Sequence, residues 1–471
     1  MSSSSPDSVV AEVREGSYGS KVVAVEPGGA EFIPLSERHG KPWGLFGTWM
    51  SPNLEFATVF VGVIAVLYFQ LTIWQAIAAL AIGNILGSLS QGVLSSRGPL
   101  FGVPQMVLSR IPFGYHGNVL PAGLNAIIAT IGWFAVNSVS GAFALASLTG
   151  MDPKLAVVIV IILELIIGFF GHNLLQRFER VAFPFLAAAF ILAAIWIVPN
   201  ADTGAATGGG GIGGFLIVVG ASFGYAAGWN PYASDYTRYL SPKVNRRAVG
   251  WAAGLGVFVS CMALETLGAL SITIASPEGS TPTEAFIAPM PSVIGKLVLL
   301  AIFVGAVSAN AINIYSGGMS FLTMGFNVPG HLRRAIIALV AGVIGGAVAF
   351  YGLDNIGNYE NFLLVIAYWV GPWLGVVYVD WFLRRRHQVD GFLFDKKHNP
   401  WAGWLAMLIG VVVSIWLFSN QVQYVGVLPS ANSAWGDCTF EAGFIISAVL
   451  YFIFFKLQKG KTDEILVIPN S

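Results

Sequence analysis

Long, continuous runs of apolar residues recur along almost the whole chain and limit what it can fold into. In residues 155–170, LAVVIVIILELIIGFF, one residue in sixteen is charged. A helix needs about 20 mostly apolar residues to cross a bilayer, whereas the strands of a membrane barrel alternate over about ten. Charged residues make up 10% of the chain, against about 25% in soluble domains. The sequence therefore predicts an all-α polytopic membrane protein.

Twelve of these runs are long enough to be transmembrane helices. If the N-terminus is cytoplasmic, every Lys and Arg except Lys154 and Lys296 lies in a cytoplasmic segment, as the positive-inside rule requires. We therefore expect a multi-pass protein of the plasma membrane with both termini in the cytoplasm. The approximate ranges of the spans are 47–68, 73–94, 120–148, 154–172, 181–199, 211–233, 249–275, 291–318, 333–352, 359–383, 401–419 and 439–457.

The first span begins with polar residues that a plain membrane anchor does not need. The stretch TWMSPNLEFATVF places Ser51, Pro52, Asn53 and Glu55 at its start. Proline removes a backbone donor and clashes with the preceding turn, so it favours an interrupted helix here. The alternative is that these residues cap a helix that starts at the membrane interface.

A second candidate interruption is GYAAGWNPYASDYTRYL, residues 224–240, at the end of the sixth span. A continuous helix from Ile212 to Leu240 would be about 43 Å long at 1.5 Å per residue. That length exceeds the roughly 30 Å hydrocarbon core. Either the helix leaves the bilayer near Gly228, or it breaks there and a second short helix carries Asp235 toward the cytoplasm. The second interpretation makes this segment part of a binding site.

Two further spans carry polar side chains at membrane depth, where such groups are costly. In the third span, Trp133 and Asn137 are four residues apart and share one helix face. Together they offer a ring for stacking and an amide for hydrogen bonding to a planar polar ligand. The eighth span places Ser308, Asn310 and Asn313 within one and a half turns. Ordinary interhelical hydrogen bonding is the alternative for both sets.

The interruptions in spans one and six, and the polar groups in spans three and eight, repeat at a distance of five spans. Paired interrupted helices in inverted repeats are typical of secondary transporters that bind substrate at the membrane midplane. An odd number of spans per repeat inverts the second copy relative to the first. We expect a disordered cytoplasmic N-terminal tail, two five-helix repeats, two additional C-terminal helices and a cytoplasmic tail, over residues 1–45, 46–200, 201–385, 386–458 and 459–471.

Four segments together resemble the nucleobase:cation symporter family one and, within it, the purine–cytosine permease branch. They are the loop GPLFGVPQMVLSRIPFGYHGN, the pair Trp133 and Asn137, the segment GWNPYASDYTRY and the run NIYSGGMSF. The likeness covers nearly all of residues 40–460. It implies the LeuT-like fold, with a five-plus-five inverted repeat and two C-terminal helices. It also implies a secondary active transporter that imports a nucleobase, cytosine or a purine, by cation symport through alternating access.

The resemblance also assigns roles to individual residues. Two indole rings would hold a flat heterocycle between them, since stacking is worth about 1–3 kcal/mol per base in nucleic-acid binders. Asparagine amides would hydrogen-bond its edge, and a glycine would let the backbone approach it. The substrate-binding residues implied in this way, together with the polar residues of the first and eighth spans, are Trp133, Asn137, Gly228, Trp229, Asn313, Ser51, Asn53 and Asn310.

The coupling ion is where the sequence departs from the family pattern. Sodium-coupled members bind the cation with first-span carbonyls and two adjacent hydroxyls of the eighth span; here Ser308 keeps one hydroxyl, but its neighbour is Ala309. Unless Asn310 replaces the lost ligand, a proton is favoured over sodium. Glu164 and Glu265 stand alone in spans four and seven, where a protonated or snorkelling side chain is the alternative to a proton relay. The candidate coupling residues are Ser308, Glu55, Glu265 and Asp235.

Other functions fit the sequence less well. The chain has no HExxH or GxSxG motif, and all six histidines fall in cytoplasmic segments or at their edges, so an enzyme is not expected. We expect no cofactor besides the co-transported proton or sodium ion, no nucleic-acid partner for a chain of zero net charge, and a functional monomer. The alternative is a transporter of the same fold for a related heterocycle (hydantoin, allantoin, uracil or a vitamin precursor) or for an amino acid.

Overall fold

A helix occupies each of the twelve apolar ranges that the sequence predicts. The computed structural model describes residues 8–14, 18–204, 209–275, 281–326, 333–352, 359–458 and 460–468. Within these residues, ten helices are long and apolar enough to cross a membrane, and a bent pair over residues 44–67 makes an eleventh if it is one span. The helix at residues 402–418 is apolar but shorter. A total of twelve membrane crossings therefore stays a prediction.

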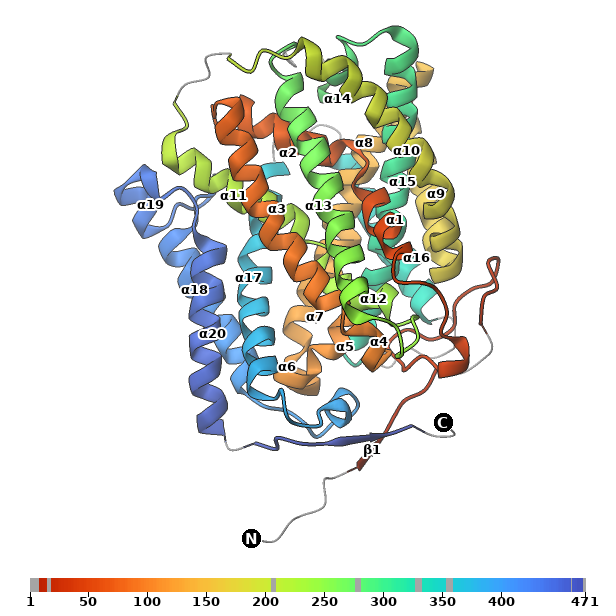
Figure 1. Cartoon of the computed structure of the whole chain (residues 1–471), viewed down its shortest axis with the longest axis vertical. Helices are drawn as coiled ribbons and strands as arrows, with labels where there is room; N and C mark the ends of the chain where they lie inside the picture. Colours follow the sequence, from red (N-terminus) through yellow and green to blue (C-terminus); the bar gives the residue numbers. More distant parts are fainter. Residues whose placement is uncertain are drawn as a thin grey trace.

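The first five predicted spans, coloured from red to yellow in Figure 1, are spread across the helix bundle. Three short helices, α4 (Gly98–Phe101), α5 (Gln105–Leu108) and α6 (Arg110–Gly117), fold the loop between the second and third spans. The spans themselves are α1 (Gly44–Met50) with α2 (Phe56–Leu67), α3 (Ile73–Ser95), α7 (Val119–Ile127) with α8 (Phe134–Thr149), α9 (Pro153–Phe170) and α10 (His172–Asn200).

The next five spans pack among the first five rather than beside them, since α11 and α13 pack along α3, and α15 packs against α8 and α10. A short helix, α14 (Pro282–Ile287), lies at one end of the bundle. The spans are α11 (Gly211–Ala227) with α12 (Ala233–Thr237), α13 (Arg246–Ser271), α15 (Ser292–Thr323), α16 (Arg333–Gly352) and α17 (Tyr359–Leu383).

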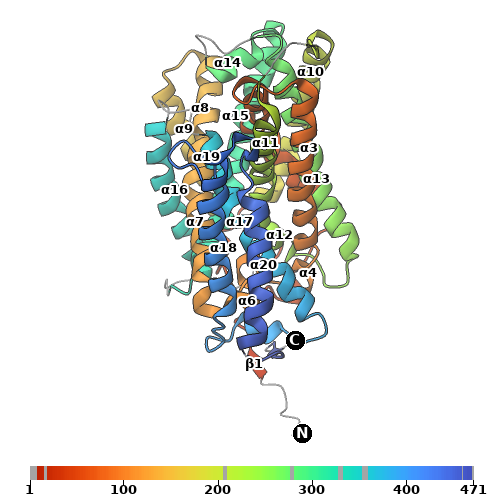
Figure 2. The same ribbon diagram turned by 90° about the vertical axis from the view of Figure 1, so that its left-hand side faces the viewer.

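The C-terminal helices α18 (Ala402–Phe418) and α20 (Thr439–Gln458) pack against each other and against α17 at one side of the bundle (Figure 2). The short helix α19 (Val427–Ala431) and the 3-10 turns η6 (Asp390–Leu393) and η7 (Ser433–Trp435) complete the connections. This pair is an addition to the ten-helix bundle, as the sequence predicts.

The first span is interrupted in the middle of the protein. α1 ends at Met50, a 3-10 turn follows at η2 (Ser51–Asn53), and α2 leaves at 58° to the first segment. Glu55 begins α2, because its carboxylate accepts the backbone N–H groups of Ala57 at 2.7 Å and Thr58 at 3.2 Å. Ser51 and Asn53 are fully buried. The interruption is therefore confirmed, and a cap at the membrane interface is excluded.

The sixth span is also interrupted inside the bundle. α11 ends at Ala227, Gly228 and Trp229 form a turn, and η4 (Asn230–Tyr232) leads into α12. Every residue from 217 to 240 is buried. A helix that left the bilayer near Gly228 would expose the residues after it, so the break is confirmed. The change of direction is smaller than in the first span, because residues 211–237 still form one membrane-length helical segment.

The N-terminal segment differs from the disordered tail expected over residues 1–45. Of that range, residues 1–7 and 15–17 lie outside the described part. β1 (Ser8–Val10) pairs in parallel with β2 (Ile465–Val467), and a 3-10 turn forms at η1 (Leu35–Glu37). The two strands lie at the end of the bundle where both chain termini lie (Figure 1). The segment is ordered because its buried charges pair with the helices above it, as described below.

Candidate functional site

The two interrupted spans meet at Trp229. Its indole Nε1 donates a hydrogen bond to Asn53 Oδ1 at 2.8 Å, and Asn53 Nδ2 donates to the carbonyl oxygen of Trp49 at 2.8 Å. The ring of Trp49 lies edge-on to that of Trp229, with centroids 6.0 Å apart. Both ends of the Asn53 amide are therefore used to hold Trp229 in place.

Trp133 lies against the same break from the third span. It ends a π-helical turn, η3 (Ile128–Trp133), and such turns inside α-helices are frequent at functional sites. The indole packs edge-on against Tyr225 and Phe362, with centroids 5.3 and 5.2 Å apart. A Cβ atom added to Gly228 would lie 3.3 Å from Trp133 Nε1. The glycine therefore allows the indole to approach the sixth-span break closely.

Asn310 is the centre of a buried amide cluster between spans three, four and eight. Its Oδ1 accepts hydrogen bonds from Asn137 at 3.1 Å and Asn313 at 3.2 Å. Its Nδ2 donates to the Phe134 carbonyl at 2.8 Å and to Glu164 at 2.9 Å. Because both ends of this amide are occupied, Asn310 positions its neighbours and has no oxygen left to replace a sodium ligand.

Asn137 and Asn313 each keep a buried carbonyl oxygen without a hydrogen-bond partner. An unpaired buried acceptor costs free energy, and natural proteins retain few of them. Both oxygens belong to side chains that were predicted to bind substrate. They are acceptors that the N–H groups of a ligand can satisfy.

Ser308 lies beside a carboxyl group that the sequence interpretation missed. Its Oγ atom is 2.8 Å from both carboxyl oxygens of Glu179, which is buried on α10. Glu179 lies between Arg177 and Arg180, just before the span that the sequence predicts at 181–199. The helix begins nine residues earlier, at His172, and the two arginines are exposed while Glu179 is buried. The available signal in the sequence was spacing: Arg177 and Arg180, three residues apart, share one helix face, and Glu179 lies on another.

Glu55 occupies a structural position rather than one beside Ser308. Besides capping α2, its carboxylate accepts a hydrogen bond from the Tyr225 hydroxyl at 3.2 Å. An acidic side chain at a helix N-terminus is stabilised by the helix dipole and by the free N–H groups. The geometry therefore favours a permanent cap at the first-span break.

Glu265 and Asp235 are buried at two other places. Glu265 accepts hydrogen bonds from Asn84 at 2.5 Å and Ser222 at 3.1 Å, which joins α13 to α3 and α11. Asp235 accepts the backbone N–H of Gln105 at 2.9 Å, which ties α12 to the loop helix α5. The structure does not bring either carboxyl group to Ser308.

Glu26 forms a charged cluster under α12 at the end of the bundle that carries both termini. It makes ion pairs with Arg14 and Arg238, each at 3.2 Å, and a hydrogen bond with Tyr315 at 3.2 Å. Burial by itself would raise the pKa of Glu26, but three guanidinium groups outweigh it and lower that pKa to about 2. They belong to Arg334, Arg238 and Arg14.

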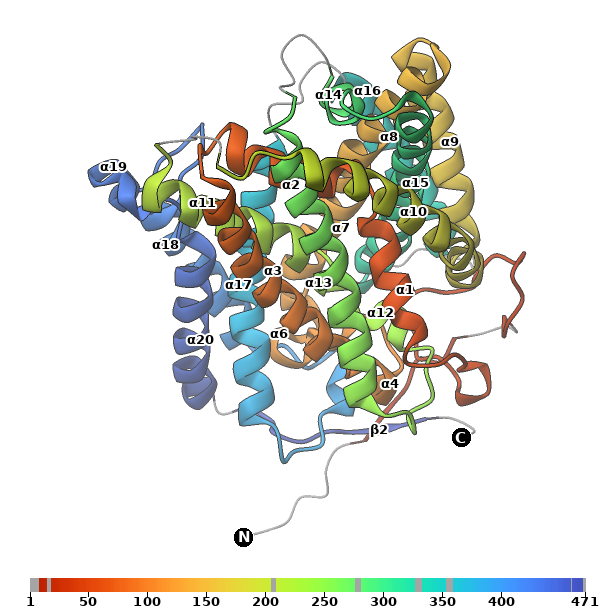
Figure 3. The same cartoon turned by 45° about the horizontal axis from the view of Figure 1, so that its top comes forward.

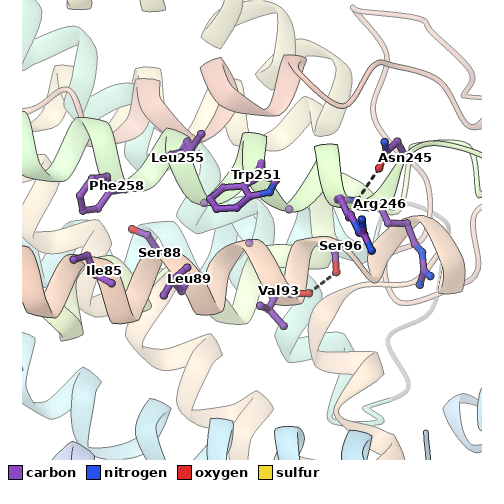
Figure 4. A pocket seen from close by; sticks show the side chains of 14 residues that line it. Ile85, Ser88, Leu89, Val93, Ser96, Asn245, Arg246, Trp251, Leu255 and Phe258 are labelled. Carbon is purple, nitrogen blue, oxygen red and sulfur yellow. Dashed lines mark hydrogen bonds between the residues drawn. The ribbon is translucent and has the colours of Figure 1, made fainter. Parts of the chain in front are cut away.

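The tryptophans and asparagines of the candidate site are buried, with Trp133 and Trp229 each 7% exposed, so the site is closed to bulk water in this conformation. A groove of about 870 Å³ lies elsewhere, on the outer surface between α3 and α13 (Figure 4). Its lining includes Leu89, Trp251 and Phe258, with Arg246 at one end. None of the predicted site residues lines this groove.

A helical bundle with two buried, interrupted spans, whose breaks meet beside tryptophan and asparagine side chains, has the architecture of a secondary transporter. Residues 32–436 match the family described as permeases for cytosine/purines, uracil, thiamine and allantoin, and the chain belongs to this family. The predicted membership of nucleobase:cation symporter family one is confirmed. The chain is thus a membrane permease and not an enzyme.

Individual relatives agree with this assignment. The putative purine-cytosine permease YxlA of Bacillus subtilis is 28% identical over 92% of this chain and 96% of its own length. The purine-cytosine permease fcyB of Emericella nidulans is also 28% identical, over 91% of this chain and 87% of its own. The closed structure of Mhp1, a nucleobase-cation-symport-1 transporter with bromovinylhydantoin bound, superposes with a TM-score of 0.73 at 19% identity, over 92% of this chain and 95% of that one. The LeuT-like fold is therefore confirmed.

Proposed function

We propose that the chain is a secondary active transporter that imports a nucleobase, cytosine or a purine, together with a proton. The observation that carries this proposal is the pair of unpaired carbonyl oxygens on Asn137 and Asn313, which belong to one amide cluster. Asn137 lies one helical turn from Trp133, whose indole approaches the sixth-span break at Gly228. A nucleobase is flat and uncharged, and its ring and exocyclic N–H groups are donors at its edge. Aromatic faces and amide acceptors are the groups that bind such a molecule. The purine–cytosine permeases among its relatives support the same substrate class.

Alternating access through the two interrupted spans supports transport. The site is closed here, so a substrate can enter and leave only if the bundle opens toward each side in turn. Breaks in helices supply points where a segment can tilt without unfolding its neighbours. The hydrogen bond from Trp229 to Asn53 makes the two breaks move as one unit.

The positive-inside rule supports a cytoplasmic location for the end that carries both termini. At that end, Lys41, Arg177 and Arg180 line a cavity of about 310 Å³. We place the transporter in the plasma membrane with this cavity facing the cytoplasm, and with one chain as the functional unit.

The oxygen atoms near Ser308 support a proton rather than a sodium ion as the coupling ion. Sodium needs several oxygen ligands, and Ala309 has no hydroxyl to offer. The Asn310 oxygen, the other candidate ligand, already accepts two hydrogen bonds. The carboxyl group beside Ser308 can instead bind a proton directly.

Uptake of labelled cytosine into proteoliposomes tests the proposal. Proton and sodium gradients are imposed separately, and adenine, hypoxanthine, uracil, hydantoin, allantoin and leucine are offered as competitors. We expect an inward proton gradient to drive uptake and adenine or hypoxanthine to compete with it. Competition by hydantoin or allantoin alone would reassign the substrate to a related heterocycle, and competition by leucine alone would overturn the nucleobase assignment.

A further inference from the structure

We propose that the carboxyl group of Glu179 carries the coupling proton. This inference rests on the proton-coupled transport proposed above. Glu179 lies on α10, where this helix packs against α15 and against the first-span break at η2. α1 and α10 lie beside each other in Figure 3, and α15 lies near them in Figure 1. The carboxyl group thus sits between the interrupted first span and the eighth span, two elements of different repeats.

The donors around Glu179 are few and uncharged. The Ser308 hydroxyl has one proton, yet its oxygen lies 2.8 Å from both carboxyl oxygens. One of the two contacts is therefore donated by a protonated carboxyl, or the single hydroxyl proton is shared between two acceptors. The hydroxyl of Ser51 on η2, which packs against α10, is buried without a hydrogen-bond partner. Hydroxyls alone stabilise a buried negative charge poorly, so the closed site favours the neutral carboxylic acid.

No cation compensates Glu179 within the described residues. Its neighbours along α10, Arg177 and Arg180, are exposed, and no Lys, Arg or His among the described residues forms an ion pair with it. Glu26 provides the contrast, since two guanidinium groups contact it directly. A lone buried carboxyl group changes its charge when water reaches it, which makes its protonation depend on the conformation of the transporter.

Two other buried carboxyl groups on neighbouring helices have their hydrogen-bond partners elsewhere. On α9, Glu164 points instead to Ser138 and Asn310. The carboxyl group of Glu265 on α13 is bonded to α3 and α11. The Tyr236 phenol on α12 lies between the elements that flank Glu179, with its ring centroid 5.3 Å from that of Trp49 on α1 and 5.9 Å from that of His172 on α10.

Tyr236 lies on the proposed route by which the proton leaves. The same residue lines the 310 Å³ cavity at the end of the bundle that carries both termini, together with His39 and His172. When the inner half of the sixth span moves, water from this cavity can reach the Glu179 carboxyl past the phenol. The cavity therefore gives the proton an exit on the side where the substrate is released.

The proposed cycle is balanced in protons. On the outer side, a proton from water forms an O–H bond with one Glu179 carboxyl oxygen and makes the side chain neutral. The site then closes around the neutral group. On the inner side, the same O–H bond breaks, and the proton passes to water in the cavity. The empty transporter then returns with Glu179 as the carboxylate, so that one proton has crossed with each substrate molecule and the next proton is taken up on the outer side.

The test uses the full-length protein in sodium-free proteoliposomes. Labelled cytosine uptake is measured under an inward gradient of one pH unit, and separately as counterflow against unlabelled cytosine with no gradient. One pH unit supports about tenfold accumulation for one proton per cytosine. The variants are E179Q, which mimics the neutral form and keeps the contact with Ser308, and E179D, which keeps a carboxyl group. E441Q changes a partly buried glutamate on α20, remote from the site, and is the matched control.

We expect about tenfold accumulation by the wild type and by E441Q. E179Q should accumulate no cytosine above the external concentration, while its counterflow stays within about twofold of the wild type. E179D should restore accumulation at a lower rate. A pH dye inside the vesicles should report cytosine-dependent acidification for the wild type and none for E179Q.

Other outcomes overturn the inference and separate it from the proposed function. If the wild type does not transport cytosine, the proposed function fails and the inference with it. If E179Q still accumulates cytosine, or if E265Q loses accumulation in its place, the function stands and Glu179 is not the carrier. Loss of counterflow in both E179Q and E179D would show a structural role. A parallel assay replaces the pH gradient with an inward sodium gradient, and uptake that sodium drives in the wild type but not in E179Q would make Glu179 a sodium ligand instead.

Discussion

The indole Nε1 of Trp229 donates a hydrogen bond to Asn53 Oδ1 across 2.8 Å, and this bond joins the two interrupted spans of the bundle. Asn53 belongs to the break in the first span, and Trp229 to the break in the sixth. A group that is proposed to stack on the substrate is thus held by the helix whose movement opens the site. In the proposed transport cycle, substrate contact and conformational change therefore share one side chain.

The bond between Trp229 and Asn53 can be measured by a double-mutant cycle. N53A leaves a buried indole N–H without a partner, which costs about 1–3 kcal/mol, so cytosine uptake should fall by roughly tenfold or more. W229F removes the donor and keeps an aromatic ring. If the bond matters, N53A should cause a smaller further loss in the W229F background than in the wild type. Equal losses in both backgrounds would show that the two residues act independently.

Removal of either indole should strongly reduce uptake by removing a stacking surface. Base stacking on an aromatic side chain is worth about 1–3 kcal/mol, which corresponds to roughly 5- to 150-fold weaker binding. W133A and W229A should therefore reach the cell surface normally and bind and transport far less cytosine than the wild type at micromolar concentrations. The matched control is W416A, because Trp416 on α18 is 56% exposed and remote from the site. Near-normal uptake by W229A would remove Trp229 from the binding site.

Asn313 is expected to be necessary for uptake and dispensable for insertion. N313A removes one free acceptor for the substrate and one donor to Asn310. We expect loss of cytosine uptake with surface expression intact, measured by transport and surface labelling of the same cells. N245A, at an exposed cap of α13, is the control for an asparagine-to-alanine change. Uptake close to the wild-type rate would contradict the assignment of Asn313.

The Glu26 cluster should make stability depend on acid pH. The pKa of Glu26 falls from its ordinary value of 4.5 to about 2, so the folded state favours the ionised carboxylate. The resulting stabilisation, on the order of 3 kcal/mol, is present above pH 4.5 and is lost as the pH falls toward 2. Between pH 5 and 8 it does not change, so this cluster does not supply pH dependence to transport in that range.

Thermal unfolding of the purified protein in detergent between pH 3 and 7 tests this expectation. E26Q leaves buried guanidinium groups uncompensated and should be less stable by about 3–5 kcal/mol at neutral pH. It should also lose part of the acid-dependent decline seen in the wild type. E12Q is the control, since Glu12 is exposed and pairs loosely with Lys396 at 3.5 Å. Identical pH profiles for the wild type and E26Q would contradict the assigned role of the cluster.

Local patterns predicted much of the fold and part of the site. The length and apolarity of each run predicted the helices, because a segment in lipid must satisfy its own backbone hydrogen bonds. Pro52 and the glycine- and proline-containing stretch around Trp229 predicted both breaks. Trp133 and Asn137 could be placed on one face because helix geometry alone relates residues four apart.

Long-range contacts decided the rest. In the sequence, Glu179 lies between two arginines just before a predicted span, and only the packing of α10 against α15 places its carboxyl group on Ser308. From the sequence, Asn310 is a candidate substrate or sodium ligand. In the folded protein, partners on spans three and four occupy both ends of its amide. The N-terminal segment read as disordered because it is polar, yet Arg14 and Glu26 are buried against Arg238 more than 200 residues away.

The sequence by itself determined which segments are membrane helices, where two of them break and which family the chain resembles, because each of these depends on neighbouring residues or on a local motif. The tertiary structure decided which polar groups are already paired and which are free, because that depends on side chains brought together from distant spans. Whether a buried carboxyl or amide can bind a substrate or a proton depends on its partners, and those partners become known only when the helices are packed.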